Sequence, residues 1–174
     1  MKFFVIFGFL IFLGVMFSLP VLRRFISPAY WSGLPLVPVM MLAELCFGVF
    51  FNLSLWYKLT DRTEWGMYFS LGVFAMMLLL NLWLVPLIGI PEGYMGSAWA
   101  ALISYGAIMV LSWYVGKKYY PLPYQWGRMF LYGIVAAAML GLGMLLPEEG
   151  GMLWLTYLVR TLLLVIYICI LAWK

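Results

Sequence analysis

The side chains that could do chemistry are few, and the most informative ones lie between residues 44 and 64. Glu44 falls about nine residues into a long apolar run, where an ionisable group costs on the order of 3 kcal/mol to insert. Glu44, Gly48 and Asn52 are four residues apart, so a helix places them on one face. We consider two roles for this face. Either it lines a transport cavity in which Glu44 couples proton or cation movement, or the carboxyl forms a structural hydrogen bond to a neighbouring helix.

Other charged residues lie inside or between the apolar runs. Arg160 is roughly eight residues into the last run. Its long side chain could reach the membrane surface, pair within the protein, or bind an anionic group. Lys58, Asp61 and Arg62 are clustered between two apolar runs, which predicts a cytoplasmic hairpin connector. A second hypothesis is that these three residues gate a cavity from the inside.

The sequence does not indicate an enzyme. It contains no histidine, which removes the commonest general base and metal ligand, and it has no glycine-rich phosphate loop. Glu148 and Glu149 are adjacent, so their side chains diverge. We therefore expect no catalytic residues, no metal and no cofactor. The net charge of +4 does not predict a nucleic-acid partner, because basic residues in an apolar chain report topology first.

Composition identifies the class of protein that must hold these residues. The chain of 174 residues is 67% hydrophobic and 9% charged, whereas soluble domains are about 25% charged. A membrane-spanning helix needs about 20 mostly apolar residues. We predict an all-α integral membrane bundle of six transmembrane helices, forming a single membrane domain over residues 1–174. The expected spans are residues 3–22, 35–57, 65–88, 96–115, 129–146 and 152–173.

The distribution of basic residues predicts the orientation of these spans. Seven lie on one side of the six-span arrangement, and only Arg23 and Arg24 lie in loops on the other. Because cytoplasmic loops carry the excess of Lys and Arg, we expect both termini in the cytoplasm. The basic and aromatic segment KKYYPLPYQWGR suits contact with anionic lipid headgroups. The seven residues are Lys2, Lys58, Arg62, Lys117, Lys118, Arg128 and Lys174.

Small residues recur every four positions in two of the expected spans. In lipid, such stripes let helix backbones approach closely, where no hydrophobic effect brings helices together. We therefore expect these positions to pack against neighbouring helices. The stripes are Gly96, Ala100 and Ser104 in the fourth span, and Gly133, Ala137 and Gly141 in the fifth.

Two segments are more specific than composition. Residues 52–63, NLSLWYKLTDRT, follow the pattern N-x-x-x-W-Y-K-L-T-D-x-T. Further along, LNLWLVPLIGIPEGYMGSAWAALISY combines Asn-x-x-x-x-Pro, a glycine-containing turn and the helix start Gly96-Ser97-Ala98. In this order, over about residues 35–120, the sequence resembles the oligosaccharide and polysaccharide flippases of the multidrug/oligosaccharidyl-lipid/polysaccharide exporter superfamily.

The resemblance implies a multi-pass protein of the bacterial inner membrane that acts in polysaccharide biosynthesis. Such a protein translocates undecaprenyl-linked oligosaccharide by alternating access, so its partners are that lipid-linked oligosaccharide and the membrane lipids. The chain then corresponds to the last six helices of a two-lobe transporter, and it is either a truncated part of that transporter or needs a partner that supplies the missing N-terminal lobe. Glu44, Asn52 and Arg160 are the candidate cargo or coupling residues. A truncated membrane scaffold that transports nothing, and a multidrug exporter fragment of the same superfamily, are the alternatives.

Overall fold

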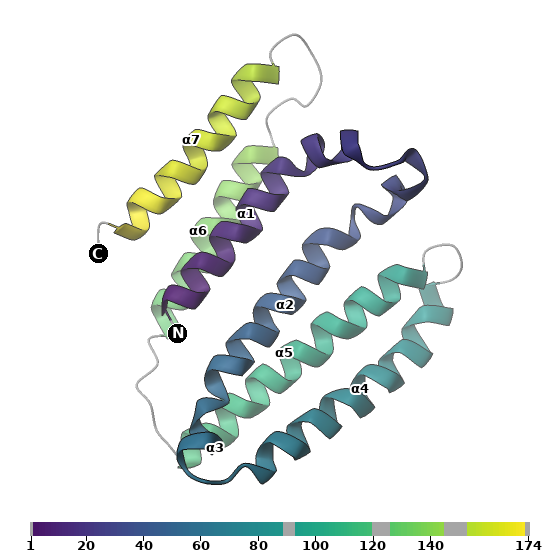
Figure 1. Ribbon diagram of the computed structural model, residues 1–174, viewed down its shortest axis with the longest axis vertical. Coiled ribbons are helices and arrows are strands. Elements are labelled where there is room, and N and C mark those ends of the chain that lie inside the picture. The colour runs from purple at the N-terminus through teal and green to yellow at the C-terminus, as the bar shows by residue number, and fades with distance from the viewer. Residues whose placement is uncertain (1, 89–92, 120–125, 145–152, 173–174) are drawn as a thin grey trace. The chain divides into compact units, whose positions relative to one another are not determined.

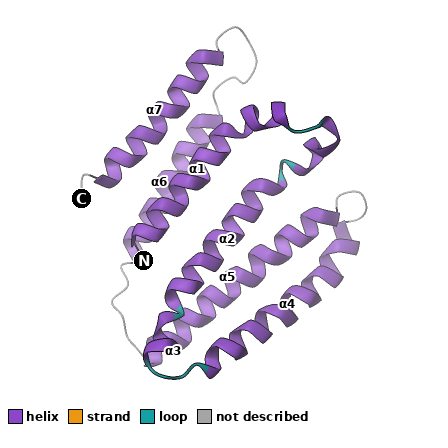
Figure 2. Ribbon diagram, viewed as in Figure 1, coloured by secondary structure: helices purple, strands orange, loops and turns teal. Residues whose placement is uncertain are grey.

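The computed structural model describes residues 2–88, 93–119, 126–144 and 153–172. Over these residues the regular structure is entirely helical, which confirms the all-α prediction (Figures 1 and 2). Apolar runs of this length form helices because a helix pairs its own backbone N–H and C=O groups where no water is present. The elements are α1 (Lys2–Phe25), the 3-10 helix η1 (Pro28–Gly33), α2 (Leu36–Leu53), α3 (Leu55–Leu59), α4 (Glu64–Ile88), α5 (Gly93–Tyr119), α6 (Trp126–Met144) and α7 (Leu153–Ala172).

Four helical stretches in the described part of the chain are long and apolar enough to cross a membrane. They coincide with the first four predicted spans, and α2 and α3 together make up the second. α5 continues four residues beyond its predicted end at residue 115, because its last turn carries interfacial residues that the span estimate left out. The four stretches are Phe3–Phe25, Leu36–Leu59, Glu64–Ile88 and Gly93–Tyr119.

α6 and α7 lie where the fifth and sixth spans were predicted. Their described apolar segments are Leu131–Gly143 and Leu158–Tyr167. α6 and α7 are 19 and 20 residues long, about the length that crosses a bilayer, but their side chains are described only over these segments. The number of six spans therefore stays a prediction.

The helices divide into two compact units, and each is described by itself. Unit 1 covers residues 32–124 and contains α2 to α5. Unit 2 covers residues 2–31 and 125–174 and contains α1, α6 and α7. The prediction of one membrane domain over residues 1–174 stays a prediction.

α5 lies between α2 and α4 in unit 1 and contacts both of them (Figure 1). Its predicted stripe of small residues is buried, and the same four-residue spacing continues to the end of the helix. Four residues of an α-helix turn through about 400°, so the stripe drifts by about 40° at each step. One stripe can therefore face α4 near its start and α3 near its end. The stripe comprises Gly96, Ala100, Ser104, Ile108, Ser112 and Gly116.

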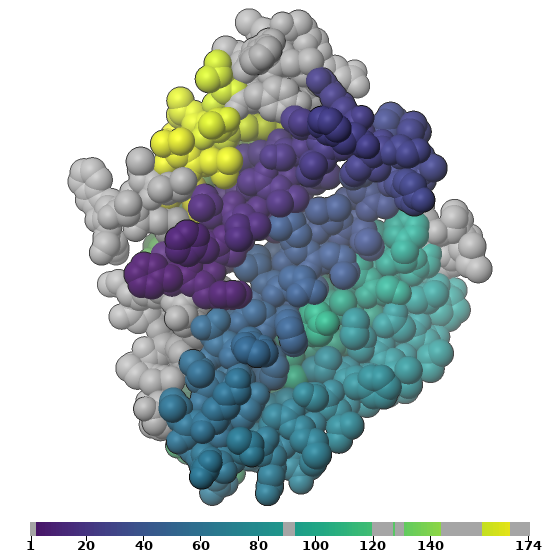
Figure 3. Space-filling model, viewed as in Figure 1, coloured from purple at the N-terminus to yellow at the C-terminus, as the bar shows by residue number. Residues whose placement is uncertain are grey.

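α4 contributes little to the interior of unit 1. Phe69 is its one buried residue in the described structure, and Leu82 and Trp83 are both about two-thirds exposed. The teal atoms of α4 form an outer edge of unit 1 in Figure 3. Apolar side chains around most of a helix suit a surface that faces lipid.

Unit 2 is built around contacts of α1 with α6 and α7. Gly133 of α6 leaves room for Phe9, because a Cβ at this glycine would lie 3.3 Å from the ring. Gly143 in the last turn of α6 admits the ring of Phe17 in the same way. The buried core comprises Leu13, Phe17, Ala136, Met139 and Tyr167.

The predicted stripe of small residues in α6 is only partly correct. Gly133 packs as expected, but Ala137 and Gly141 are exposed, and a Cβ at Gly141 would meet no atom within 4 Å. The face turned to α1 instead follows Gly133, Ala136 and Gly143. Ala136, Met139 and Gly143 alternate intervals of three and four residues, whose average stays close to 3.6 residues per turn and so keeps them on one face.

Gly96→Ala should lower the stability of the protein, whereas Gly106→Ala should not. A Cβ at Gly96 would lie 2.9 Å from the backbone carbonyl carbon and oxygen of Leu84, and such overpacking costs about 1–3 kcal/mol. A Cβ at Gly106, in the same helix, meets nothing within 4 Å. Thermal unfolding in detergent of the two variants and the original chain measures the difference. Equal stability of the two variants would contradict the close approach of α4 and α5.

Candidate functional site

The connector between α3 and α4 is a defined turn. Asp61 has a φ of 59°, the left-handed conformation that commonly ends helices. The Arg62 N–H donates to the Tyr57 carbonyl at 2.9 Å, and the Thr60 N–H donates to the Trp56 carbonyl at 3.0 Å. The bond that spans Asp61 is the outer hydrogen bond of a Schellman motif. Asp61 thus ends α3 and turns the chain toward α4.

An aromatic cluster underlies this turn, comprising Trp56, Tyr57, Trp65, Phe69 and Tyr119. Trp56 is only 2% exposed. Its ring stacks on that of Tyr119, with centroids 5.5 Å apart and an interplanar angle of 7°. The cluster therefore joins α3, the start of α4 and the end of α5.

Two residues of the α5 stripe receive the Trp56 ring. The Trp56 Nε1–H donates to the Ser112 hydroxyl oxygen at 3.4 Å. A Cβ at Gly116 would lie 2.8 Å from Trp56 Cδ1, so the indole occupies space that only a glycine leaves. The indole is thus buried with its polar N–H paired, as buried tryptophans usually are.

The charged residues of the connector lie outside this cluster. Lys58, Asp61 and Arg62 are all exposed. The Arg62 guanidinium lies 4.6 Å from the Tyr119 ring centroid, and the Lys58 ammonium lies 4.9 Å from that of Phe51. These are cation–π distances. The structure brings the three predicted gate residues to one turn, and their gating role stays a prediction.

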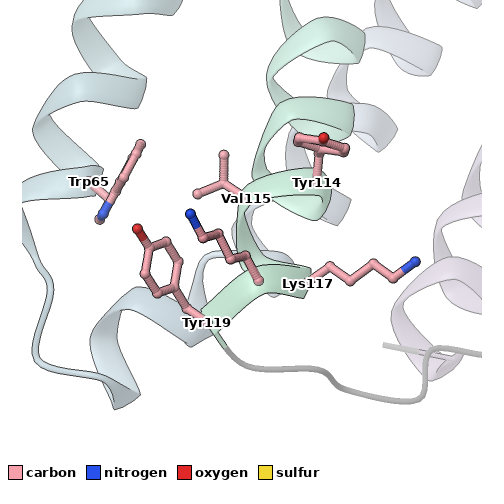
Figure 4. A pocket seen from close by; sticks show the side chains of 6 residues that line it. Trp65, Tyr114, Val115, Lys117 and Tyr119 are labelled. Carbon is pink, nitrogen blue, oxygen red and sulfur yellow. The ribbon is translucent and has the colours of Figure 1, made fainter.

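Beside the aromatic cluster is an open pocket of about 430 Å³. Trp65 of α4 faces Tyr119 and Val115 of α5, while Tyr114 lies farther from Trp65 and Lys117 extends away from it (Figure 4). Lys118 completes the lining. The pocket thus combines apolar walls with two cationic side chains from the last turn of α5.

Sequence reasoning missed this pocket although it named most of its residues. The sequence places Lys117, Lys118 and Tyr119 in a basic and aromatic segment that suits anionic headgroups, but it does not predict that Trp65 joins them in a pocket. The available signal was the spacing of Tyr114, Lys117 and Lys118, which are three and four residues apart and so neighbours on a helix. The contribution of Trp65 depends on how α4 folds back against α5.

Glu44 and Asn52 lie on α2, as predicted. Glu44 is exposed near the middle of the span. The Asn52 side-chain N–H donates to the Gly48 carbonyl at 3.1 Å, so part of its polarity is used within its own helix. The carboxyl of Glu44 remains accessible for a proton or cation, and the coupling role stays a prediction.

Arg160 lies in α7 and is only 5% exposed. Its guanidinium donates to the Gly143 carbonyl at 3.3 Å and to the Phe17 carbonyl at 3.5 Å. Gly143 is in the last turn of α6, where carbonyls lack a partner in their own helix and attract positive charge. This arrangement favours the structural alternative for Arg160, and its role toward cargo stays a prediction.

Asp61→Gly and Asp61→Val should have opposite effects on stability although both remove the same charge. Glycine adopts a φ near 59° without strain, whereas a β-branched residue there costs about 1–2 kcal/mol. We expect Asp61→Gly to unfold at or above the temperature of the original chain and Asp61→Val to unfold below it. Thermal unfolding in detergent tests this, and indistinguishable midpoints would contradict the left-handed turn.

Arg160→Met should destabilise the protein, because it leaves the buried Gly143 carbonyl, in the last turn of α6, without this donor at a cost of about 1–3 kcal/mol. Arg24→Met is the matched control, since Arg24 is exposed near the end of α1. Thermal unfolding of both variants measures the difference. An unchanged unfolding midpoint for Arg160→Met would contradict the structural role and favour the hypothesis that Arg160 contacts cargo.

Comparison with protein-family models, curated proteins and solved structures found no match for this chain. The resemblance to the flippases therefore depends on the residues quoted above.

Proposed function

We propose that this chain is part of a flippase that moves undecaprenyl-linked oligosaccharide across the bacterial inner membrane. The observation that carries the proposal is the connector over residues 52–63, whose residue order resembles that of the oligosaccharide flippases. The two central aromatic residues of this pattern, Trp56 and Tyr57, are buried, while Lys58 and Asp61 are exposed. Trp56 and Tyr57 thus pack beneath the turn, and Asp61 adopts the left-handed conformation that closes it.

The mechanism is alternating access without covalent chemistry. Such transport moves rigid groups of helices against one another around a binding site. α2 to α5 suit this task, because the aromatic cluster and the α5 stripe hold them together within unit 1. In the proposal, unit 1 moves as one group, Glu44 couples a proton or cation, and an N-terminal lobe supplies the other wall of the cavity.

A non-transporting membrane scaffold is the second candidate, and one observation favours it. Several polar side chains in the apolar helices donate to carbonyls of their own helix and so present less polarity to a cavity. Such internal bonds are a common way for hydroxyls and amides to be satisfied inside helices. The donors are Ser18, Asn52, Ser54, Ser70 and Asn81.

Reconstitution of the full chain into liposomes tests the proposal. A fluorescent undecaprenyl-linked oligosaccharide in the inner leaflet becomes accessible to a membrane-impermeant quencher only after it crosses. We expect faster quenching than in protein-free vesicles. We also expect Glu44→Gln to abolish the pH dependence of the rate, whereas the control Glu64→Gln, at the exposed start of α4, keeps it.

A second measurement tests whether the chain binds the cargo, even if it cannot transport the cargo without a partner lobe. A photoreactive version of the same lipid should label the chain in native membranes, and unlabelled lipid-linked oligosaccharide should compete with it. If neither transport nor competed labelling is observed, the proposal is overturned and the scaffold is supported. Transport of a cationic drug without transport of the oligosaccharide would instead indicate a multidrug exporter.

A further inference from the structure

The pocket beside the aromatic cluster has the chemistry of an anion site. Two of its six lining residues, Lys117 and Lys118, are cationic and exposed, and none is acidic. Within the described residues, both ammonium groups lie near aromatic rings. The Lys117 ammonium is 5.7 Å from the Trp113 ring centroid, and the Lys118 ammonium is 5.9 Å from that of Tyr119. Both ammonium groups therefore keep N–H donors for an anion.

The walls of the pocket are held in place before any ligand arrives. Tyr119 is stacked on the buried Trp56 and also carries the Arg62 guanidinium. Trp65 contacts both Trp56 and Tyr119, with ring centroids 6.0 and 6.2 Å away. A ligand entering the pocket therefore does not have to order these rings, which reduces the entropic cost of binding.

The position of the pocket selects the kind of anion. Lys117 and Lys118 belong to the last turn of α5, a helix long and apolar enough to cross a membrane. Tyr, Trp and Lys side chains at the end of such a helix lie at the depth of the lipid headgroups. The volume of about 430 Å³ is within the range of small-molecule sites, about 300–1,000 Å³.

An exposed apolar path leads from the pocket along the same helix. Tyr114, at the pocket, is 73% exposed. Spacings of four and seven residues place the next exposed side chains of α5 on nearly the same face. An acyl chain whose headgroup occupies the pocket has this path to lie along. The path runs through Tyr114, Leu111, Val110, Ile103 and Trp99.

We infer that this pocket binds the phosphate-bearing headgroup of an anionic phospholipid, with Lys118 contacting the phosphate, Lys117 adding positive charge on the outer side of the pocket, and α5 contacting an acyl chain. Free phosphate and soluble phosphate esters carry the same phosphate group. The exposed apolar path along α5 favours a lipid over these soluble ligands. This inference does not rest on the proposed transport function. It concerns a lipid of the surrounding bilayer and not the cargo.

Native mass spectrometry of the full chain released from detergent tests the site. The chain is titrated with phosphatidylglycerol and, separately, with phosphatidylcholine. We expect the first lipid to bind selectively. Lys117→Gln/Lys118→Gln should weaken phosphatidylglycerol binding by about thirtyfold, as two lysines near an anionic surface imply, and Lys117→Arg/Lys118→Arg should retain it.

The control variant Arg24→Gln/Lys58→Gln removes the same charge from exposed residues outside the pocket. It should bind phosphatidylglycerol within about threefold of the original chain, since neither residue lines the pocket and exposed charges are screened by salt. If the two double variants weaken phosphatidylglycerol binding equally, the effect comes from net charge alone and the proposed site is overturned. Competition by millimolar inorganic phosphate or glycerol phosphate would overturn the lipid as its occupant and indicate a soluble phosphate instead.

Discussion

The structure of unit 1 depends on the close approach that small residues in α5 permit. Helices in lipid gain nothing from burying apolar surface against one another, because the lipid tails are equally apolar. Contact must come from van der Waals fit and from paired polar groups. Gly96 lets α5 reach the backbone of α4, and Gly116 lets it receive the indole of Trp56. These two contacts hold α5 against α4 at one end and against α3 at the other.

The same need for fit and pairing explains where polar side chains are found. Ser112 accepts a hydrogen bond from Trp56, and Arg160 supplies donors to a carbonyl in the last turn of α6. In both cases a polar group closes a contact that an apolar side chain would leave unpaired. The side chains exposed at the connector are of a different kind. Lys58 and Arg62 lie against aromatic rings and keep their charges directed to water and headgroups.

Much of this architecture could be predicted from the sequence, because helix formation in an apolar chain follows from composition alone. The first four spans and the buried stripe that begins at Gly96 are of this kind. The exposure of Ala137 and Gly141 could not be predicted, since equal spacing does not tell which face of α6 meets α1. The pocket depends on a contact between α4 and α5, which the sequence does not show. The sequence predicts that its lysines lie near anionic headgroups, but not that they line a pocket with Trp65. The position of Glu44 on α2 was predictable, whereas the surroundings of its carboxyl depend on tertiary structure.

The winding of the α5 stripe has a consequence for how the sequence can change during evolution. The stripe meets Leu84 of α4 at Gly96 and the Trp56 ring at Ser112 and Gly116, so the phase of the helix is fixed from Gly96 to Gly116. Insertion of one residue between them would rotate the rest of the helix by about 100° and move Gly116 from beneath Trp56. α4 keeps a phase of its own, because its less exposed residues recur every three or four positions from Trp65 to Val85. A one-residue insertion inside either helix should therefore be eliminated during evolution, whereas changes of length at the helix ends, outside these contacts, should be tolerated.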